Sequence, residues 1–169
     1  NHLSNALGTI NPVKEITAKA HTAGAKVLID GAQSMPHMKV DVQDIGCDFY
    51  TFSGHKMYAP SGVGGMFGRM EVMETMSPYV TVGDMILQVT LEKTTYAKPP
   101  ARFEAGTPPI TQVIGLGAAI DYLDAIGMDR IFEYEKSLLD YGTRLLQEID
   151  GLRIIGNAAD KAAILSIYL

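Results

Sequence analysis

Residues 27–33 read VLIDGAQ, a short apolar run that ends abruptly in an acidic residue. A continuous apolar run of this length is typical of a strand buried on both faces of a parallel sheet. A second run, residues 49–56, reads FYTFSGHK and also ends on polar residues. In open α/β sheets, ligands bind at the carboxyl ends of the strands. The two runs therefore predict an α/β fold with polar side chains gathered at one edge of a mainly parallel sheet.

A helix is predicted before the first strand. Asn11 is expected to cap it, with Pro12 at the first helical position, where a missing N–H costs nothing. Apolar residues then keep helical spacing as far as Gly24, which is expected to end the helix. The apolar residues with this spacing are Val13, Ile16, Ala20 and Ala23.

The spacing of the apolar residues changes in the second half of the chain. Residues 113–127 predict one helix, and a double apolar stripe predicts a long amphipathic helix from about residue 129 to 149. Residues 70–111 have no clean period and are expected to form irregular active-site or interface structure. Further short strands are predicted at residues 64–67, 152–155 and 163–169.

This order of elements predicts two units in the chain. Residues 1–127 are expected to belong to a large domain with flanking helices on the sheet. Residues 128–169 are expected to be a connecting long helix and the start of a small C-terminal α/β domain. Both ends of the sequence resemble interrupted strands, so we expect an internal piece of a longer protein.

Composition is that of an ordinary globular protein. The 169 residues are 47% hydrophobic and 20% charged, and the net charge is −5. A negative chain with scattered basic residues disfavours binding to nucleic acid or to an anionic membrane surface. No apolar run approaches the ~20 residues of a membrane span. The one cysteine, Cys47, excludes an internal disulfide framework and fits a reducing compartment, so the cytoplasm is the expected location.

The polar residues at the strand ends suit pyridoxal phosphate. Asp30 would be a charge at the end of a buried strand, which needs a partner, and the protonated pyridine nitrogen of this cofactor is such a partner. Lys56 is the amine expected to link covalently to the cofactor's aldehyde. The phosphate requires hydroxyl and N–H donors, and the 3-oxygen of the ring requires neutral donors. The residues that supply them are Ser53 and His55 for the phosphate, and Gln33 and Asn5 for the ring oxygen. No metal is expected.

The motifs DGAQ at residues 30–33 and SGHK at residues 53–56 resemble the paired motifs of the class V aminotransferase fold. The stretches SNALGT (4–9), CDFY (47–50) and RFEAGTP (102–108) narrow the resemblance to cysteine desulfurases of the Suf (group II) iron–sulfur assembly type, which are close to selenocysteine lyases. The resemblance covers nearly the whole chain, in order and at similar spacing. It implies a fold-type I pyridoxal-phosphate transferase domain.

The resemblance implies the same roles for the six residues at the strand ends, with Lys56 also acting as general base and acid. Thr107 resembles the residue that reaches the phosphate of the partner subunit in the family's homodimer. The implied reaction takes L-cysteine to L-alanine and leaves a persulfide on the enzyme, from which sulfur passes to an acceptor protein. The family's nucleophilic cysteine and its arginine for the substrate carboxylate are expected outside this chain.

Several alternatives stay open. A selenocysteine lyase acting on L-selenocysteine, an epimerase or a kynureninase would use the same anchors, and a scaffold or isolated piece without activity could retain them. Cys47 is expected in the core as a small hydrophobe, because a sulfur nucleophile needs an exposed thiolate. His2, His21 and His37 carry no motif, and His21 is expected on a solvated helix face. Arg102 is interpreted as a structural ion-pair partner of Glu104 or another acid.

Overall fold

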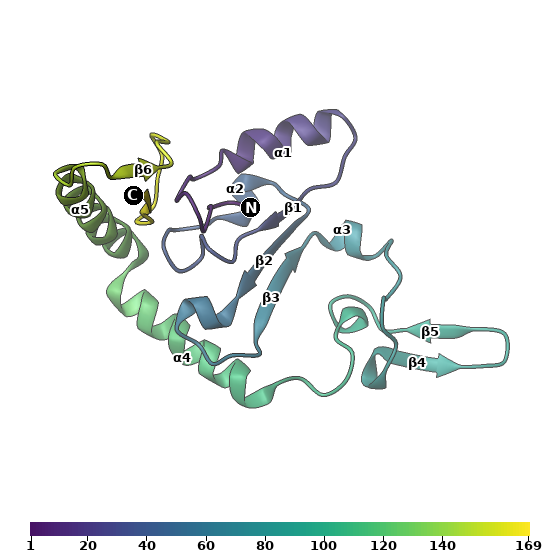
Figure 1. Cartoon of the computed structure of the whole chain (residues 1–169). Coiled ribbons are helices and arrows are strands. Elements are labelled where there is room, and N and C mark those ends of the chain that lie inside the picture. Colours follow the sequence, from purple (N-terminus) through teal and green to yellow (C-terminus); the bar gives the residue numbers. More distant parts are fainter.

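A three-stranded sheet lies at the centre of the computed structural model, which describes residues 1–169 apart from the side chain of Asp84. Its order is β1 (Leu28–Asp30), β2 (Phe49–Ser53) and β3 (Gly64–Gly68). β1 and β2 run parallel, whereas β3 returns antiparallel to β2, so the sheet is mixed within this chain. The parallel pair places the carboxyl ends of β1 and β2 at the same edge, as predicted (Figure 1).

The main core lies between this sheet and two helices, α1 (Val13–Thr22) and α2 (Val42–Ile45). Cys47 is completely buried there, as the sequence predicted. The buried residues of this core are Val13, Val27, Ile29, Ile45, Cys47 and Tyr50. Of the predicted apolar run, Leu28 is exposed, so β1 is not covered on both faces within this chain.

Helix α1 begins one residue later than predicted, because Pro12 rather than Asn11 is its N-cap. The Asn11 side chain instead donates from Nδ2 to the backbone and side-chain oxygens of Asn1. The buried face also differs from the prediction, since Ile16 is exposed and Thr17 is buried. α1 packs against α2, and this tertiary contact, which periodicity alone does not reveal, decides which face of the helix is covered.

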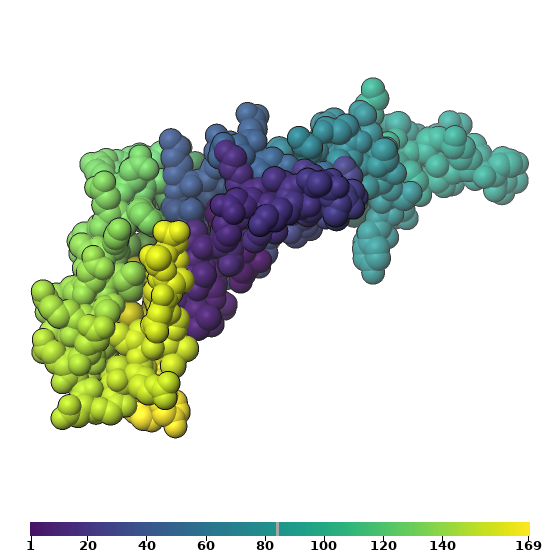
Figure 2. Space-filling view, turned by 90° about the horizontal axis from the view of Figure 1, so that it is seen from above, coloured from purple at the N-terminus to yellow at the C-terminus, as the bar shows by residue number. Residues whose placement is uncertain are grey.

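Residues 70–111 are more regular than expected. They contain α3 (Met70–Met73) and a hairpin of β4 (Ile86–Val89) and β5 (Thr94–Tyr96), with 3-10 turns at Gly83–Met85 and Ala101–Phe103. The hairpin projects away from the sheet in Figure 1 and forms one end of the molecule in Figure 2. Neither strand has a fully buried residue. The alternation of apolar and polar residues that predicts a half-buried strand is therefore not expected in this part of the sequence.

Arg102 anchors the base of this segment, but not through the ion pair that the sequence suggested. Its Nε donates to the carbonyl of Ala97 at 2.9 Å, and its Nη1 donates to the carbonyls of Glu74 and Met76 at 3.1 and 3.2 Å. The guanidinium fork satisfies three backbone acceptors at once, which a single carboxylate partner would not do. Arg102 therefore ties the end of α3 to the chain that follows β5.

The C-terminal elements follow the prediction closely. α4 (Ile110–Ile126) and α5 (Met128–Gln147) are followed by an antiparallel pair, β6 (Arg153–Ile155) and β7 (Ser166–Tyr168). The segment before β7 folds back onto the N-terminal residues, where the amide of Ala162 donates to the carbonyl of Gly8 at 2.9 Å (Figure 1). The division into two domains at residue 127 stays a prediction. No helix among the described residues is both long and apolar enough to cross a membrane.

Candidate functional site

The two motifs meet beyond the ends of the parallel strands. Lys56 lies in η1 (Gly54–Met57), the turn directly after β2, and its Nζ donates to Oε1 of Gln33 at 3.1 Å. Gln33 follows three residues after Asp30, the last residue of β1. The parallel pairing of β1 and β2 therefore brings the DGAQ and SGHK motifs together, as the sequence predicted.

Asp30 is exposed, which corrects the expectation of a desolvated charge. Its Oδ1 accepts a hydrogen bond from the amide of Ala32 at 2.9 Å, a contact that stabilises the turn locally. No ion pair joins Asp30 to a lysine, arginine or histidine among the described residues. The carboxylate therefore has acceptor capacity left for a cationic group at this edge of the sheet.

Gly31 allows the turn at residues 30–33 to rest directly on a buried tyrosine. A Cβ on Gly31 would lie 1.9 Å from Cε1 of Tyr50. The Tyr50 hydroxyl hydrogen-bonds with Nδ1 of His2 at 2.8 Å and with Oγ of Ser34 at 2.6 Å, and Ser34 also donates to the carbonyl of Gly31. Burial, opposed in part by the Ser34 hydrogen bond, raises the pKa of Tyr50 to about 12. The protonated phenol is thus a fixed support for the turn.

Ser53 is the last residue of β2 and His55 lies two residues later in η1, and both side chains are uncommitted. Ser53 is half-buried and His55 is exposed, and neither side chain hydrogen-bonds with another described residue. Close packing holds the turn instead, since a Cβ on Gly54 would lie 2.7 Å from a methyl group of Val63. Tyr58 closes the turn with a left-handed φ of 65°, a strained conformation of the kind that clusters at functional sites.

Asn5 and Thr107 are the two predicted residues that the structure does not join to this cluster. Asn5 is exposed in a turn near the N-terminus. Three residues earlier, the backbone amide of His2 donates to the carbonyl of Asp30 at 2.8 Å. Thr107 is exposed and lines a separate cavity of about 440 Å³ together with Gly62. Among the described residues, no hydrogen bond links either side chain to the other predicted residues. Their roles stay predictions.

Sequence reasoning missed His37, which carries no recognisable motif. Its Nε2 lies 3.3 Å from Nε2 of Gln33, and its Nδ1 lies 2.9 and 3.0 Å from the two carboxylate oxygens of Glu135 on α5. The four-residue separation from Gln33 was the only local signal. Glu135 is 98 residues away in the chain, so no local pattern relates it to His37.

His21 is partly exposed, as expected of a helix face, but the sequence did not reveal that its ring contacts a buried carboxylate. Its Nε2 lies 2.8 Å from Oδ2 of Asp48, which also accepts from the amide of Val27 at 2.8 Å, while Oδ1 accepts from Nζ of Lys26 at 3.2 Å. Burial by itself raises the pKa of the Asp48 carboxyl, but these hydrogen bonds outweigh it and lower the pKa to about 2. Asp48 therefore stays ionised in the core and joins the end of α1 to the sheet.

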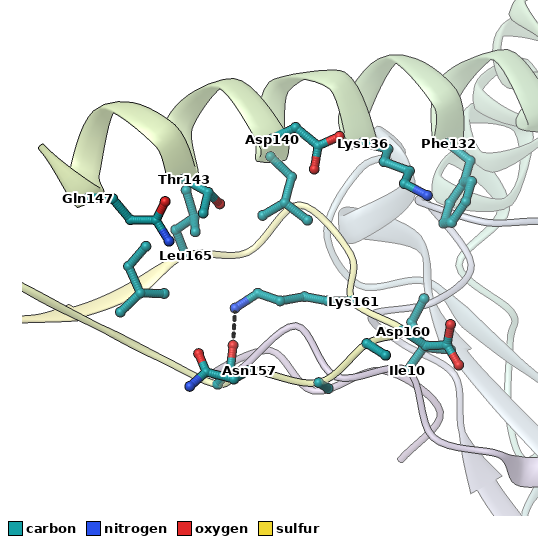
Figure 3. Close-up of a pocket in the computed structure, with 15 residues that line it drawn as sticks. Ile10, Phe132, Lys136, Asp140, Thr143, Gln147, Asn157, Asp160, Lys161 and Leu165 are labelled. Carbon is teal, nitrogen blue, oxygen red and sulfur yellow. Dashed lines mark hydrogen bonds between the residues drawn. The ribbon is translucent and has the colours of Figure 1, made fainter.

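A further cavity of about 310 Å³ lies between α5 and the segment before β7 (Figure 3). Lys136 and Asp140 line it from α5, and Lys161 lines it from the facing segment, where its Nζ donates to the carbonyl of Gly156 at 2.8 Å. None of the seven predicted residues lines this cavity, so it is not the predicted site. Within the described residues, no group of three or more His, Cys, Asp or Glu is arranged to hold a metal ion.

The whole chain, residues 1–169, matches the sequence model of a family described as aminotransferase class-V. The chain belongs to the class-V aminotransferase family. This class-V chain is 53% identical over 167 residues to a cysteine desulfurase of Synechococcus elongatus, a match that covers 99% of the chain and 27% of that relative.

Two solved structures resemble this class-V chain. An apo cysteine desulfurase from Thermococcus onnurineus NA1 matches with a TM-score of 0.93 and 38% identity, over 99% of this chain and 42% of its own. The protein C-DES, solved with glycine covalently linked to its pyridoxal-phosphate cofactor, matches with a TM-score of 0.85 and 26% identity, over 98% of this chain and 45% of its own.

These likenesses confirm the predicted fold-type I architecture. The class-V chain spans less than half the length of each of these three relatives. The group II subtype is specified by none of them and stays a prediction.

Proposed function

We propose that this chain forms the cofactor-binding part of a pyridoxal-phosphate-dependent cysteine desulfurase, which converts L-cysteine to L-alanine and retains the sulfur as an enzyme persulfide. The observation that carries the proposal is the contact of Lys56 with Gln33 beside Asp30, at the edge where two parallel strands end. The 53% identity to a cysteine desulfurase supports the choice of substrate.

The residues at this edge fit the cofactor. Asp30 has an uncommitted acceptor for the pyridine nitrogen, and the Ser53 and His55 side chains have donors available for the phosphate. Gln33, with Asn5, suits the ring oxygen. When bound, pyridoxal phosphate supplies an electron sink for charge that develops at the substrate α-carbon. Lys56 is the covalent anchor.

The protein's own contribution to catalysis is proton transfer and electrostatic control. Lys56 is the amine placed to remove a proton at the substrate α-carbon and to return one later, as general base and acid. The Asp30 carboxylate keeps the pyridine nitrogen protonated, which maintains the electron demand of the ring. Cys47 is not the proposed sulfur acceptor, because it is completely buried and desolvation raises the pKa of its thiol.

The destination of the sulfur is proposed on the resemblance to the Suf type. We infer that an acceptor protein takes it into iron–sulfur cluster assembly, in the cytoplasm, and that neither a nucleic acid nor a membrane is a partner. The single cysteine and the net charge of −5 support these inferences. In the enzyme of which this chain is the proposed cofactor-binding part, release of alanine from L-cysteine, compared with its release from L-selenocysteine at equal concentration, separates a desulfurase from a selenocysteine lyase. An epimerase or kynureninase would release alanine from neither.

Reduction of the cofactor-loaded protein with borohydride should place a pyridoxyl label on Lys56, detected by peptide mass mapping. The Lys56→Ala variant should lose the label, because Lys56 is the lysine whose Nζ hydrogen-bonds to Gln33 beside Asp30. Lys14→Ala is the matched control, since Lys14 pairs with Asp44 on the surface and the label should persist. A label on any lysine other than Lys56 would end the proposal.

We also propose a homodimer in which the β4–β5 hairpin contacts the second copy and Thr107 reaches the neighbouring phosphate. The hairpin carries exposed apolar side chains, among them Leu87, Val89 and Leu91, and a monomer rarely leaves such a surface uncovered.

Analytical ultracentrifugation should find a dimer that Val89→Asp shifts toward monomer, because a carboxylate would be desolvated in the apolar contact. The control is Tyr134→Asp, an equally exposed position on α5 at the other end of the molecule (Figure 2). The hairpin assignment fails if Val89→Asp sediments like the unmodified protein.

A further inference from the structure

A continuous series of hydrogen bonds connects Lys56 to α5. Nζ of Lys56 donates to Oε1 of Gln33 at 3.1 Å, and Nε2 of Gln33 lies 3.3 Å from Nε2 of His37. The other ring nitrogen of His37, Nδ1, lies 2.9 and 3.0 Å from the carboxylate oxygens of Glu135. The series thus joins three parts of the fold: the turn after β2, the turn after β1, and the long helix.

The chemistry of these groups permits one consistent direction. An ammonium has only donors, so the oxygen of the Gln33 amide must face Lys56, and its NH₂ must then face His37. The Nε2 atom of His37 must therefore accept, which places the ring proton on Nδ1, where it donates to Glu135. If the His37 proton were on Nε2 instead, the oxygen of the Gln33 amide would turn toward His37 to accept it. The NH₂ group of Gln33 would then face the ammonium of Lys56, and both of these groups are donors.

We propose that His37 is a positioning residue for Lys56, and that it acts by holding the Gln33 amide with its oxygen toward the amine. Glu135 in turn fixes the His37 tautomer. The inference rests on the proposed function in so far as Lys56 is the cofactor lysine. It adds His37 and Glu135 to the residues proposed for the cofactor.

The environment of the pair suits a permanent contact. The side chains of His37 and Glu135 are only 26% and 22% exposed, so solvent screens their interaction less than it screens a surface pair. Glu135 also belongs to α5, which packs against α4 and β6. The Gln33 amide is therefore oriented from a rigid helix and not from a loop, as accurate positioning requires.

Acylation of Lys56 in the protein freed of cofactor tests this inference. At a fixed pH, a trace of acetic anhydride followed by peptide mass spectrometry gives the relative rate at each lysine, with Lys14 as internal standard. His37→Leu leaves Gln33 free to flip, so Nζ of Lys56 loses its hydrogen-bond acceptor part of the time and is held less firmly away from the reagent. We expect Lys56 to react about threefold faster, the change that corresponds to losing part of one hydrogen bond.

Four further variants define the route of the effect. Glu135→Ala should accelerate labelling of Lys56 less than His37→Leu does, and the double variant should be no faster than His37→Leu alone, because both act through one path. His37→Gln should restore the unmodified rate, since its side-chain oxygen can accept from Gln33. Glu133→Gln, an exposed acid on the same helix, should change nothing.

The inference is overturned if His37→Leu labels Lys56 at the unmodified rate, if His37→Gln behaves like His37→Leu, or if Lys14 accelerates to the same extent as Lys56. The last result would mean a general loosening of the fold. Neither cofactor nor cysteine is present in the assay, so its outcome is independent of whether borohydride places a pyridoxyl label on Lys56.

Discussion

Replacement of Gly31 by alanine is expected to abolish cofactor binding and to lower the free energy of unfolding by about 3 kcal/mol or more. The new Cβ would lie 1.9 Å from Cε1, 2.2 Å from Cζ and 2.4 Å from the hydroxyl oxygen of Tyr50. The ring cannot move aside easily, because it is buried and its hydroxyl is hydrogen-bonded to His2 and Ser34. The turn must shift instead, and it carries both Asp30 and Gln33.

Urea denaturation and a spectroscopic titration with pyridoxal phosphate measure the two effects of this substitution. Gly117→Ala is the matched control, because Gly117 lies inside α4 and a methyl group there would meet nothing within 4 Å beyond the backbone of its own helix. It should be neutral or stabilising by up to ~1 kcal/mol, as alanine favours helices over glycine. Normal cofactor affinity and stability in Gly31→Ala would show that the turn does not depend on its close contact with Tyr50.

Substitution of Asp48 by asparagine is expected to lower the free energy of unfolding by about 2–3 kcal/mol at pH 7. The carboxylate is fully buried and faces three donors, on His21, Lys26 and the backbone of Val27. Asparagine would direct its own NH₂ group at one of these donors and would leave the lysine ammonium without its counter-charge. Urea denaturation at pH 7 measures the loss.

Asp44→Asn is the matched control, because it removes the same charge from a pair that lies on the surface. Asp44 is bound by Lys14 at 2.5 Å, but the two side chains are 61% and 64% exposed. Exposed pairs of this kind contribute under about 1 kcal/mol. If Asp48→Asn and Asp44→Asn lowered the free energy of unfolding equally, the expectation that the buried carboxylate contributes more than the exposed one would be wrong.

Stability should also depend on pH through Asp48. Its pKa is lowered from 3.8 to about 2, so the folded state binds this proton less readily than the unfolded state. Its contribution, on the order of 2–3 kcal/mol, is therefore complete above pH ~4 and is lost as the pH falls toward 2. Urea titrations across this range should show a smaller acid loss in Asp48→Asn than in the unmodified protein.

The sequence was most informative where short motifs dictate backbone geometry. The DGAQ and SGHK motifs each need their glycine for close packing, on Tyr50 and Val63 respectively, and both contacts are present. Apolar periodicity also located α4 and α5, because these helices repeat over enough residues to give a clear signal. The hairpin at residues 86–96 was missed because it has no buried face within the chain.

By itself, the sequence determined that two strands end in a shared polar edge, and that Lys56 and Asp30 lie there, since the order of motifs along parallel strands fixes their side of the sheet. Only the tertiary structure decided which face of α1 is buried, which carboxylate His21 meets, and that Glu135 reaches Gln33 through His37. The His21–Asp48 and His37–Glu135 contacts join residues 27 and 98 positions apart. Periodicity records only neighbours within a turn or a strand, whereas such pairings depend on how whole elements pack.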